Sequence, residues 1–265
     1  MTIFQAIIIA IIEGITEFLP ISSTAHMRIA ESLMGLSETD SFTKLFTIVI
    51  QFGAILSVVV IYWRKFLDVK NPMFFAKIGL ATIPALIFGK LFNDNIDAIM
   101  EKPMIIGIIM LAGGVLLLFV DNIFKKPTID DENKISVQKA FFIGCFQCLA
   151  ILFPGFSRSA ATIIGGMSMK ISRNAAAEFS FFLAVPTMLA ATGYKLYKYF
   201  KESANGFTSE EITLITIGNV VAFIVALLAI KFFIAFLKKY GFKMWGVYRI
   251  IVGIIVVILC LSGNM

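Results

Sequence analysis

The chain has 265 residues, of which 59% are hydrophobic and only 15% are charged, and its mean hydropathy is +0.92. A soluble domain carries about 25% charged residues, so this composition excludes an ordinary soluble protein and predicts an integral membrane protein. Apolar runs of more than about ten residues favour spanning helices over barrel strands. The net charge of +6 is expected to lie mostly in loops, where it indicates orientation rather than nucleic-acid binding.

The first segment, 2–34, is apolar but interrupted between Glu13 and Ser23. Its first twelve residues lack a basic region, so no cleavable signal peptide is predicted. A second interrupted segment, 137–170, breaks at Pro154 and Gly155. Each half of these two segments is too short to cross a bilayer, so each segment is expected to form a re-entrant helical hairpin.

Six further segments are long and apolar enough to cross the membrane. The predicted fold is therefore all-α and polytopic, with six transmembrane helices and two re-entrant hairpins. Three spans follow each interrupted segment. The expected spans are 42–63, 73–92, 103–120, 175–197, 211–236 and 245–262.

Basic residues are distributed unevenly between the two sets of loops that this topology creates. Four loops, at 64–72, 121–136, 170–174 and 237–244, carry eleven, whereas the opposite loops, 31–44, 93–102 and 198–211, carry four. The positive-inside rule places the first set in the cytoplasm and both termini outside. The eleven are Arg64, Lys65, Lys70, Lys125, Lys126, Lys134, Lys170, Arg173, Lys238, Lys239 and Lys243, and the four are Lys44, Lys102, Lys198 and Lys201.

The two interrupted segments resemble each other, which indicates an internal repeat within a single domain, 1–265. FLPISSTA at 18–25 corresponds to LFPGFSRSA at 152–160 when an offset of 134 aligns the two prolines. The same offset pairs Ser23 with Ser157 and Glu13 with Gln147. Because a hairpin with three spans is inserted in the opposite sense the second time, repeats of about 1–134 and 135–265 have inverted topology. The tips of the two hairpins are then expected to meet near the midplane.

Glu13 and Glu17 lie four residues apart in the first interruption, on one face of a helix. Ionised carboxylates in a membrane interior need a partner, which could be a divalent cation, Arg158 or a shared proton. The alternative is a buried polar pair that only holds helices together. Pro20 then ends this helix, and Ser23 and His26 share a face of the next one. A histidine there suits proton transfer or nucleophilic attack.

The second interruption reads PGFSRSAAT at 154–162. Hydroxyl groups, an arginine and free backbone N–H groups at a helix N-terminus describe an anion site. The planar guanidinium of Arg158 suits phosphate oxygens, although the residue could instead extend to the membrane surface. We therefore expect four residues to bind phosphate, namely Ser157, Arg158, Ser159 and Thr162.

Together the two interruptions suit phosphoryl transfer. Ser23 or His26 would attack phosphorus or activate water, and Glu13 and Glu17 would hold a metal ion, orient His26 or act as a base. These residues alone leave the nucleophile open, with a slight preference for Ser23 at its helix N-terminus.

EGITEFLPISSTAH at 13–26, together with PGFSRSAAT, closely resembles the two signature motifs of the bacterial undecaprenyl-diphosphate phosphatases, the bacitracin-resistance family. The likeness extends over the whole chain, including GCFQC at 144–148 and EFSFFLAVP at 178–186. Residues of the first motif are Glu13, Glu17, Ser23 and His26, and residues of the second are Ser157, Arg158, Ser159 and Thr162.

The resemblance implies removal of the terminal phosphate of undecaprenyl diphosphate, which recycles the lipid carrier for peptidoglycan synthesis and confers bacitracin tolerance. It further implies Mg²⁺ or Ca²⁺ dependence, a bacterial plasma-membrane location, an active site facing the periplasm or exterior, and often a homodimer. The competing hypothesis is a lipid-phosphate transporter or flippase, because inverted repeats are common in transporters. A structural membrane subunit would leave both motifs unexplained.

Overall fold

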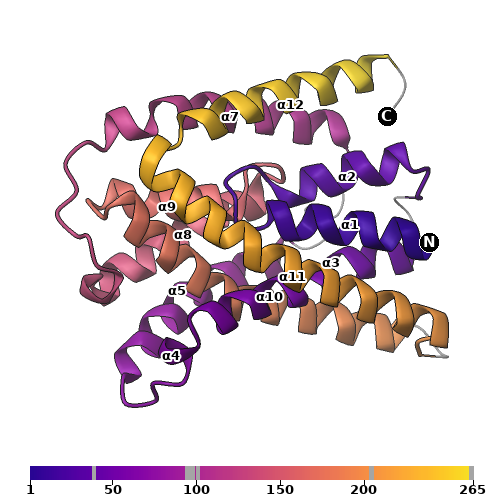
Figure 1. Ribbon diagram of the computed structural model, residues 1–265, viewed down its shortest axis with the longest axis horizontal. Coiled ribbons are helices and arrows are strands. Elements are labelled where there is room, and N and C mark those ends of the chain that lie inside the picture. The colour runs from indigo at the N-terminus through magenta and orange to yellow at the C-terminus, as the bar shows by residue number, and fades with distance from the viewer. Residues whose placement is uncertain (38–39, 93–98, 100–101, 203–205, 263–265) are drawn as a thin grey trace.

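Figure 1 shows a computed structural model that describes residues 1–37, 40–92, 99, 102–202 and 206–262. Within these ranges the regular structure is helical, apart from one isolated bridge between Ile129 and Ile171. Six of the described helices are long and apolar enough to span a membrane, as predicted. They are α3 (Ser41–Ile61), α5 (Pro72–Leu91), α7 (Pro103–Ile123), α10 (Arg173–Glu202), α11 (Ser209–Tyr240) and α12 (Lys243–Leu261).

Helix α11 is longer than its predicted apolar span because its polar ends are good helix termini. Thr208 caps α11, and Glu210 and Glu211 follow in its first turn, whereas Lys238 and Lys239 occupy its last turn. Acidic residues at the N-terminus and basic residues at the C-terminus complement the helix dipole. The helix therefore continues beyond the predicted range 211–236.

Each interrupted segment forms two shorter helices separated by a break. The first contains α1 (Ile3–Thr16) and α2 (Ser23–Leu33), and the second contains α8 (Val137–Leu152) and α9 (Arg158–Ser168). At 1.5 Å per residue none of the four reaches the thickness of about 30 Å of a hydrocarbon core. We call residues 17–22 the first break and residues 153–157 the second break.

The helix caps show how the two segments correspond. Thr2 and Ser136 cap α1 and α8, an offset of 134, but Ser22 and Ser157 cap α2 and α9, an offset of 135. The predicted pairing of Ser23 with Ser157 is therefore shifted by one residue. The second break holds one more residue between its proline and its cap. Gly155 supplies this extra residue with φ +100°, where a Cβ atom would lie 2.9 Å from the Ile106 carbonyl oxygen.

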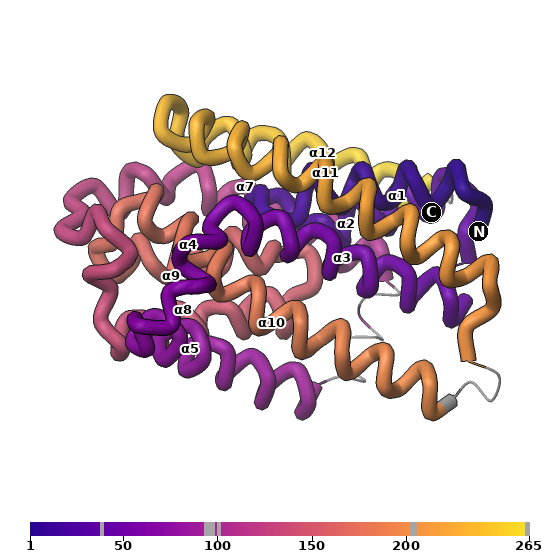
Figure 2. Tube along the Cα trace, turned by 60° about the horizontal axis from the view of Figure 1, so that its bottom comes forward, coloured from indigo at the N-terminus to yellow at the C-terminus, as the bar shows by residue number. Residues whose placement is uncertain are grey.

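Helices from the N-terminal and C-terminal halves of the chain pack against each other. Helix α1 packs on α11, and α8 packs on α5, while α7 packs on α12 and α3 packs on α10. Glycines allow close approach: a Cβ atom on Gly14 would lie 2.8 Å from the Ala222 carbonyl oxygen, and one on Gly144 would lie 2.1 Å from that of Ala81. In Figures 1 and 2, α1 and α2 lie near one end of the molecule and α8 and α9 near the other.

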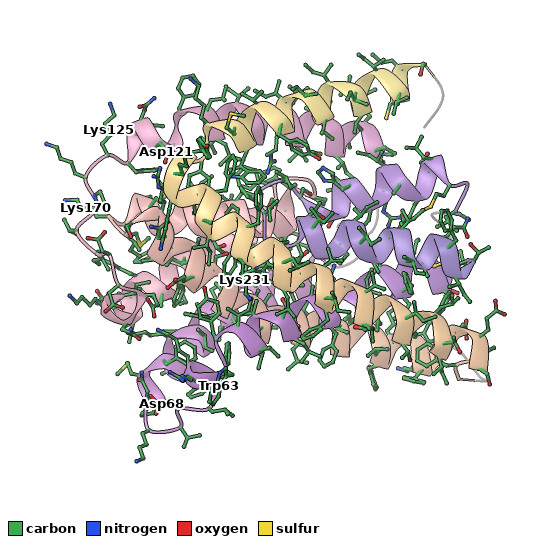
Figure 3. The ribbon with its side chains drawn as sticks, viewed as in Figure 1. Trp63, Asp68, Asp121, Lys125, Lys170 and Lys231 are labelled. Carbon is green, nitrogen blue, oxygen red and sulfur yellow. The ribbon has the colours of Figure 1, made fainter. Side chains whose placement is uncertain are left out.

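The four loops that carry the predicted basic excess lie together at one end of the molecule. Lys65 pairs with Glu132, and the Thr128 amide donates to the Lys170 carbonyl at 2.8 Å. Arg173 also donates to the Lys238 carbonyl at 2.8 Å. Figure 3 shows Lys125 and Lys170 at this end, and Figure 1, in the same view, marks the N-terminus at the opposite end. The predicted opposite loops 31–44, 93–102 and 198–211 lie partly outside the described residues.

Candidate active site

The two breaks contact each other directly, as the sequence predicts. The Ser159 hydroxyl donates to the Phe18 carbonyl at 2.8 Å, and the Ser157 hydroxyl donates to the Leu19 carbonyl at 3.4 Å. Broken helices expose backbone carbonyls that water would satisfy in a soluble protein. Hydroxyls of Ser157 in the second break and Ser159 in the first turn of α9 take that role for the first break.

A buried arginine from α12 supports both breaks. Arg249 is fully buried, and its Nη1 atom donates to the carbonyls of Pro20, at 3.0 Å, and Phe156, at 2.7 Å. Its Nη2 atom donates to the Gly155 carbonyl at 3.0 Å, and its Nε atom to the Met110 carbonyl at 3.3 Å. Sequence reasoning did not identify this residue. A charged residue within the apolar run 245–262 was the signal that could have found it.

Glu17 joins the catalytic candidates of the two breaks. The Ser23 hydroxyl donates to its Oε2 atom at 2.5 Å, and Arg158 Nη2 donates to its Oε1 atom at 2.7 Å. Ser23 is the first residue of α2, and Arg158 is the first residue of α9. Two helix N-termini, each with a partial positive charge, therefore lie within reach of one buried carboxylate.

The guanidinium of Arg158 is held on several sides, but the described residues do not satisfy all of its donors. Its Nη1 atom donates to the Ser180 carbonyl at 3.1 Å, Nη2 also contacts the Met188 sulfur at 3.4 Å, and the group lies 5.9 Å from the centre of the Phe18 ring. The buried Nε atom has no hydrogen-bond partner among the described residues. An unsatisfied buried donor beside a carboxylate suits an oxygen of a bound anion.

Glu13 lies one turn before Glu17 and has an unusual environment. It is fully buried, and neither carboxylate oxygen has a hydrogen-bond partner among the described residues. Burying an unpaired charge is costly, so this group is suited to a cation or a proton. Groups of three or more His, Cys, Asp or Glu residues that could hold a metal are absent from the described part of the chain. A cation here would therefore need oxygens from substrate or water, as Mg²⁺ commonly does.

His26 lies on α2 with Ser23, as predicted, and its ring nitrogens contact two other residues. Its Nδ1 atom lies 2.8 Å from the Ser22 carbonyl oxygen, and its Nε2 atom lies 2.8 Å from the hydroxyl of Tyr248 in α12. Both ring nitrogens therefore contact groups other than Ser23 and the glutamates. Tyr248 was not identified from sequence, because an aromatic residue in an apolar helix is an ordinary feature there.

The remaining predicted phosphate ligands use their hydroxyls within the protein. Besides contacting the first break, the Ser157 hydroxyl accepts from the Ala160 amide at 3.3 Å as the cap of α9. The Thr162 hydroxyl is fully buried and lies 2.6 Å from that of Ser180. In this arrangement these residues and Ser159 shape the second break, and their contact with phosphate stays a prediction.

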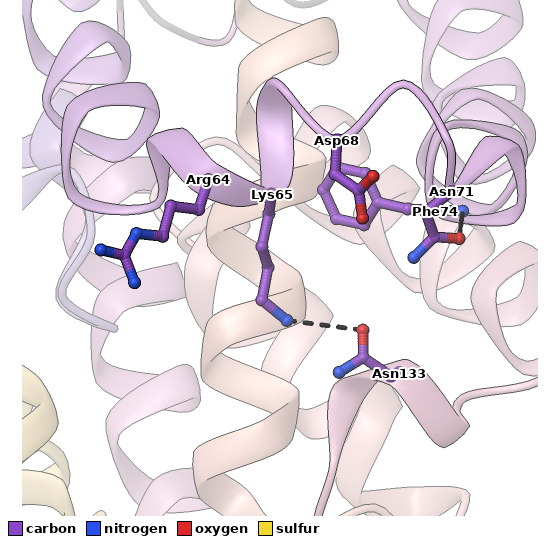
Figure 4. Close-up of a pocket in the computed structure, with 6 residues that line it drawn as sticks. All are labelled: Arg64, Lys65, Asp68, Asn71, Phe74 and Asn133. Carbon is purple, nitrogen blue, oxygen red and sulfur yellow. Dashed lines mark hydrogen bonds between the residues drawn. The ribbon is translucent and has the colours of Figure 1, made fainter.

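A separate cavity of about 270 Å³ lies at the basic-loop end of the molecule. Figure 4 shows Lys65 pointing across it, with Nζ 3.4 Å from Asn133 Oδ1. None of the predicted site residues lines this cavity, so its position does not change the candidate site. Its lining residues are Arg64, Lys65, Asp68, Asn71, Phe74 and Asn133.

Comparison with known proteins shows similarity over nearly the whole chain. Residues 6–255 match the family model described as bacitracin resistance protein BacA. An undecaprenyl-diphosphatase of Porphyromonas gingivalis is 51% identical over 99% of this chain and 98% of its own length. That of Flavobacterium psychrophilum is 55% identical over 98% and 96%, and undecaprenyl-diphosphatase 1 of Clostridioides difficile is 41% identical over 97% and 95%. On this full-length similarity, the chain belongs to the BacA family of bacitracin resistance proteins.

Proposed function

We infer that this chain is a membrane phosphatase that hydrolyses undecaprenyl diphosphate to undecaprenyl phosphate and inorganic phosphate. The names of its relatives give the substrate. The observation on this molecule that carries the inference is the Glu17 carboxylate, bonded to the Ser23 hydroxyl on one side and to Arg158 on the other. Hydrolysis regenerates the lipid carrier for cell-wall synthesis. It also removes the diphosphate, and the family description implies the resulting bacitracin resistance.

We propose Ser23 as the nucleophile and Glu17 as its base. The short bond between them places the proton of the hydroxyl on a path to the carboxylate. Ser23 Oγ would form a bond to the terminal phosphorus while Glu17 takes this proton. The bond from phosphorus to the bridging oxygen breaks, and undecaprenyl phosphate leaves. Water then attacks the phosphoserine, releases inorganic phosphate and restores the hydroxyl.

The positive groups around this path suit the charge of the transferred phosphoryl group. The Nε donor of Arg158 has no partner within the described ranges, and helices α2 and α9 both begin at residues that are hydrogen-bonded to Glu17. Preorganised donors and helix N-termini stabilise charge on phosphoryl oxygens. His26 stays a second candidate nucleophile, because its Nε2 atom contacts only a hydroxyl that can move away.

A divalent cation, Mg²⁺ or Ca²⁺, fits the unpaired carboxylate of Glu13. That residue would be the main protein ligand, since both oxygens of Glu17 already accept hydrogen bonds from protein groups. When bound, such a cation would neutralise diphosphate charge and polarise a phosphoryl oxygen. The chain's own contribution is to keep the Glu13 carboxyl buried beside Glu17, where a bound cation or a proton would compensate its charge.

The arrangement in the membrane that we propose is an inverted repeat with two re-entrant hairpins. Its support is the pairing of caps at offsets of 134 and 135, the packing of helices from the two halves against each other, and the lengths of the four short helices. We propose that the clustered basic loops face the cytoplasm and that the chain termini and the active site face the exterior.

Purified protein in lipid vesicles, supplied with undecaprenyl diphosphate, tests the function. Phosphate release that disappears in Ser23→Ala, Glu17→Gln and Arg158→Ala, each still folded, is the expected result. Movement of the lipid across the vesicle without release of phosphate would instead favour a flippase. Undiminished release in all three variants would remove the proposed site.

A further inference from the structure

The environment of His26 determines which of its nitrogens carries the proton. Nδ1 lies 2.8 Å from the Ser22 carbonyl oxygen, which can only accept a hydrogen bond. Nδ1 must therefore be the donor. In the neutral ring the proton is then on Nδ1, and Nε2 is left with a lone pair.

Tyr248 occupies the place where that lone pair points. Its hydroxyl oxygen lies 2.8 Å from Nε2, and the two rings are nearly parallel, with an interplanar angle of 5° and centroids 5.6 Å apart. Because the neutral ring accepts at Nε2, the tyrosine hydroxyl is the donor. The ring of His26 is thus held from two elements, α2 and α12.

Tyr248 is itself well placed because its neighbour in α12 is immobilised. Arg249 donates to carbonyls of both breaks and to Met110 of α7, so this turn of α12 is tied to the centre of the molecule. The Tyr248 side chain remains 40% exposed. It can therefore leave Nε2 when a substrate enters, without moving α12.

We propose that Tyr248 is a positioning residue of the active site, whose hydroxyl donates to Nε2 and, together with the Ser22 carbonyl, holds His26 in the tautomer with a proton on Nδ1 and an accepting Nε2. This inference rests on the proposed location of the phosphatase site. It makes Nε2, and not Nδ1, the ring atom that exchanges protons with water or substrate, or that attacks phosphorus. Tyr248 covers this atom until a phosphate or water replaces the hydroxyl.

The chain contains a single histidine, which makes the proposal directly measurable. The full-length protein would be labelled with ¹⁵N-histidine, purified with a tag that lacks histidine and studied by NMR in lipid nanodiscs without substrate. At a pH where the ring is neutral, we expect a pyrrole-like Nδ1 signal and a pyridine-like Nε2 signal. In Tyr248→Phe the two signals should move toward each other as both tautomers become populated.

Tyr240→Phe is the matched control, because Tyr240 is 51% exposed near the C-terminal end of α11 and has no contact with His26. Its spectrum should equal that of the wild type. A wild-type ring protonated on Nε2, or an unchanged spectrum in Tyr248→Phe, would overturn the proposal.

Kinetics supply the second measurement. Tyr248→Phe keeps the ring and loses only the hydroxyl, so we expect kcat for phosphate release to fall about ten-fold, with KM nearly unchanged. Full activity in this variant would contradict a positioning role. Full activity in His26→Ala would instead exclude His26 from the reaction and leave the site of Ser23, Glu17 and Arg158 intact, and the NMR comparison would still decide whether the Tyr248 hydroxyl helps to set the tautomer.

Discussion

Arg158 Nη2 donates to Glu17 Oε1 at 2.7 Å, although 141 residues separate the two in the chain. Both side chains are largely buried, with 14% and 7% of their surface exposed. The pair joins the end of α1 to the start of α9, so it links the two breaks as well as two site residues. An ion pair in this setting is costly unless further hydrogen bonds satisfy it, and Ser23 and Ser180 supply them.

Replacing Arg158 with lysine should lower kcat/KM for phosphate release by about a hundred-fold or more, since loss of one preorganised donor to a reacting oxyanion has effects of that order. Lysine keeps the charge but has all its donors on one atom, so it cannot reproduce the contacts that Nη1 and Nη2 make with Ser180 and Glu17 and also present a separate Nε donor to phosphate. Arg64→Lys, at the basic-loop end, is the control and should keep wild-type activity. An Arg158→Lys variant with more than half of the wild-type activity would rule out a planar, multiple-contact role.

A covalent intermediate on Ser23 should be stable to acid. Substrate labelled with ³²P in its terminal phosphate, quenched during turnover, should leave labelled protein that survives acid treatment, because a phosphoserine is acid-stable and a phosphohistidine is not. Ser23→Ala should abolish the label, whereas Thr24→Ala, the neighbouring hydroxyl, should retain it. Label that is lost in acid and in His26→Ala would identify His26 as the nucleophile.

Substitution of Glu13 by glutamine should raise the Mg²⁺ concentration needed for half-maximal activity by about ten-fold or more, since a neutral amide is a poor ligand for a hard cation. Thermal unfolding in detergent without metal should not be weakened, because neither carboxylate oxygen has a hydrogen-bond partner to lose among the described residues. Glu210→Gln, in the exposed first turn of α11, should change neither quantity. An unaltered Mg²⁺ requirement in Glu13→Gln would exclude this residue as a ligand.

Arg249→Met should destabilise the fold by about 3 kcal/mol or more, because it leaves the carbonyls of Pro20, Gly155 and Phe156 without their donor and each buried unsatisfied group costs about 1–3 kcal/mol. Chemical unfolding in mixed micelles measures the difference. Arg64→Met should stay within about 0.5 kcal/mol of wild type. Equal stability of the two variants would show that water satisfies both breaks.

Gly144→Ala should lower the free energy of unfolding by about 1–3 kcal/mol, since its Cβ atom would lie 2.1 Å from the Ala81 carbonyl oxygen and force α8 away from α5. Gly79→Ala is a matched control within α5, because its Cβ atom would meet nothing within 4 Å. Alanine is the better helix former, so this control should be neutral or stabilising by up to about 1 kcal/mol. Thermal melts of both variants in one detergent make the comparison, and a Gly144→Ala variant as stable as Gly79→Ala would show that the two helices separate at little cost.

Much of the architecture can be predicted from the chain alone because it depends on local physics. Apolar runs of sufficient length must be helical in a bilayer, and the structure confirms six such helices. Proline followed shortly by serine favours a helix end and a new N-cap, so the breaks near Pro20 and Pro154 occur as predicted, with serine caps after them. Proline alone does not end a helix here, because Pro84 and Pro186 lie inside α5 and α10. The polar residues at and beside both breaks can also be recognised in the sequence, because they interrupt apolar segments.

Contacts between distant segments were decided by packing. The residue pattern alone places Glu13, Glu17, Ser23, His26 and Arg158 in or within a few residues of the breaks in apolar segments. Tertiary packing brings Ser23 and Arg158 into hydrogen-bonding distance of Glu17. It also brings Tyr248 to the ring of His26 and places Arg249 between the breaks. The physical reason is that periodicity assigns a residue to a face of its own helix, whereas its partner depends on the close approach of other helices, which glycines such as Gly14 and Gly144 permit.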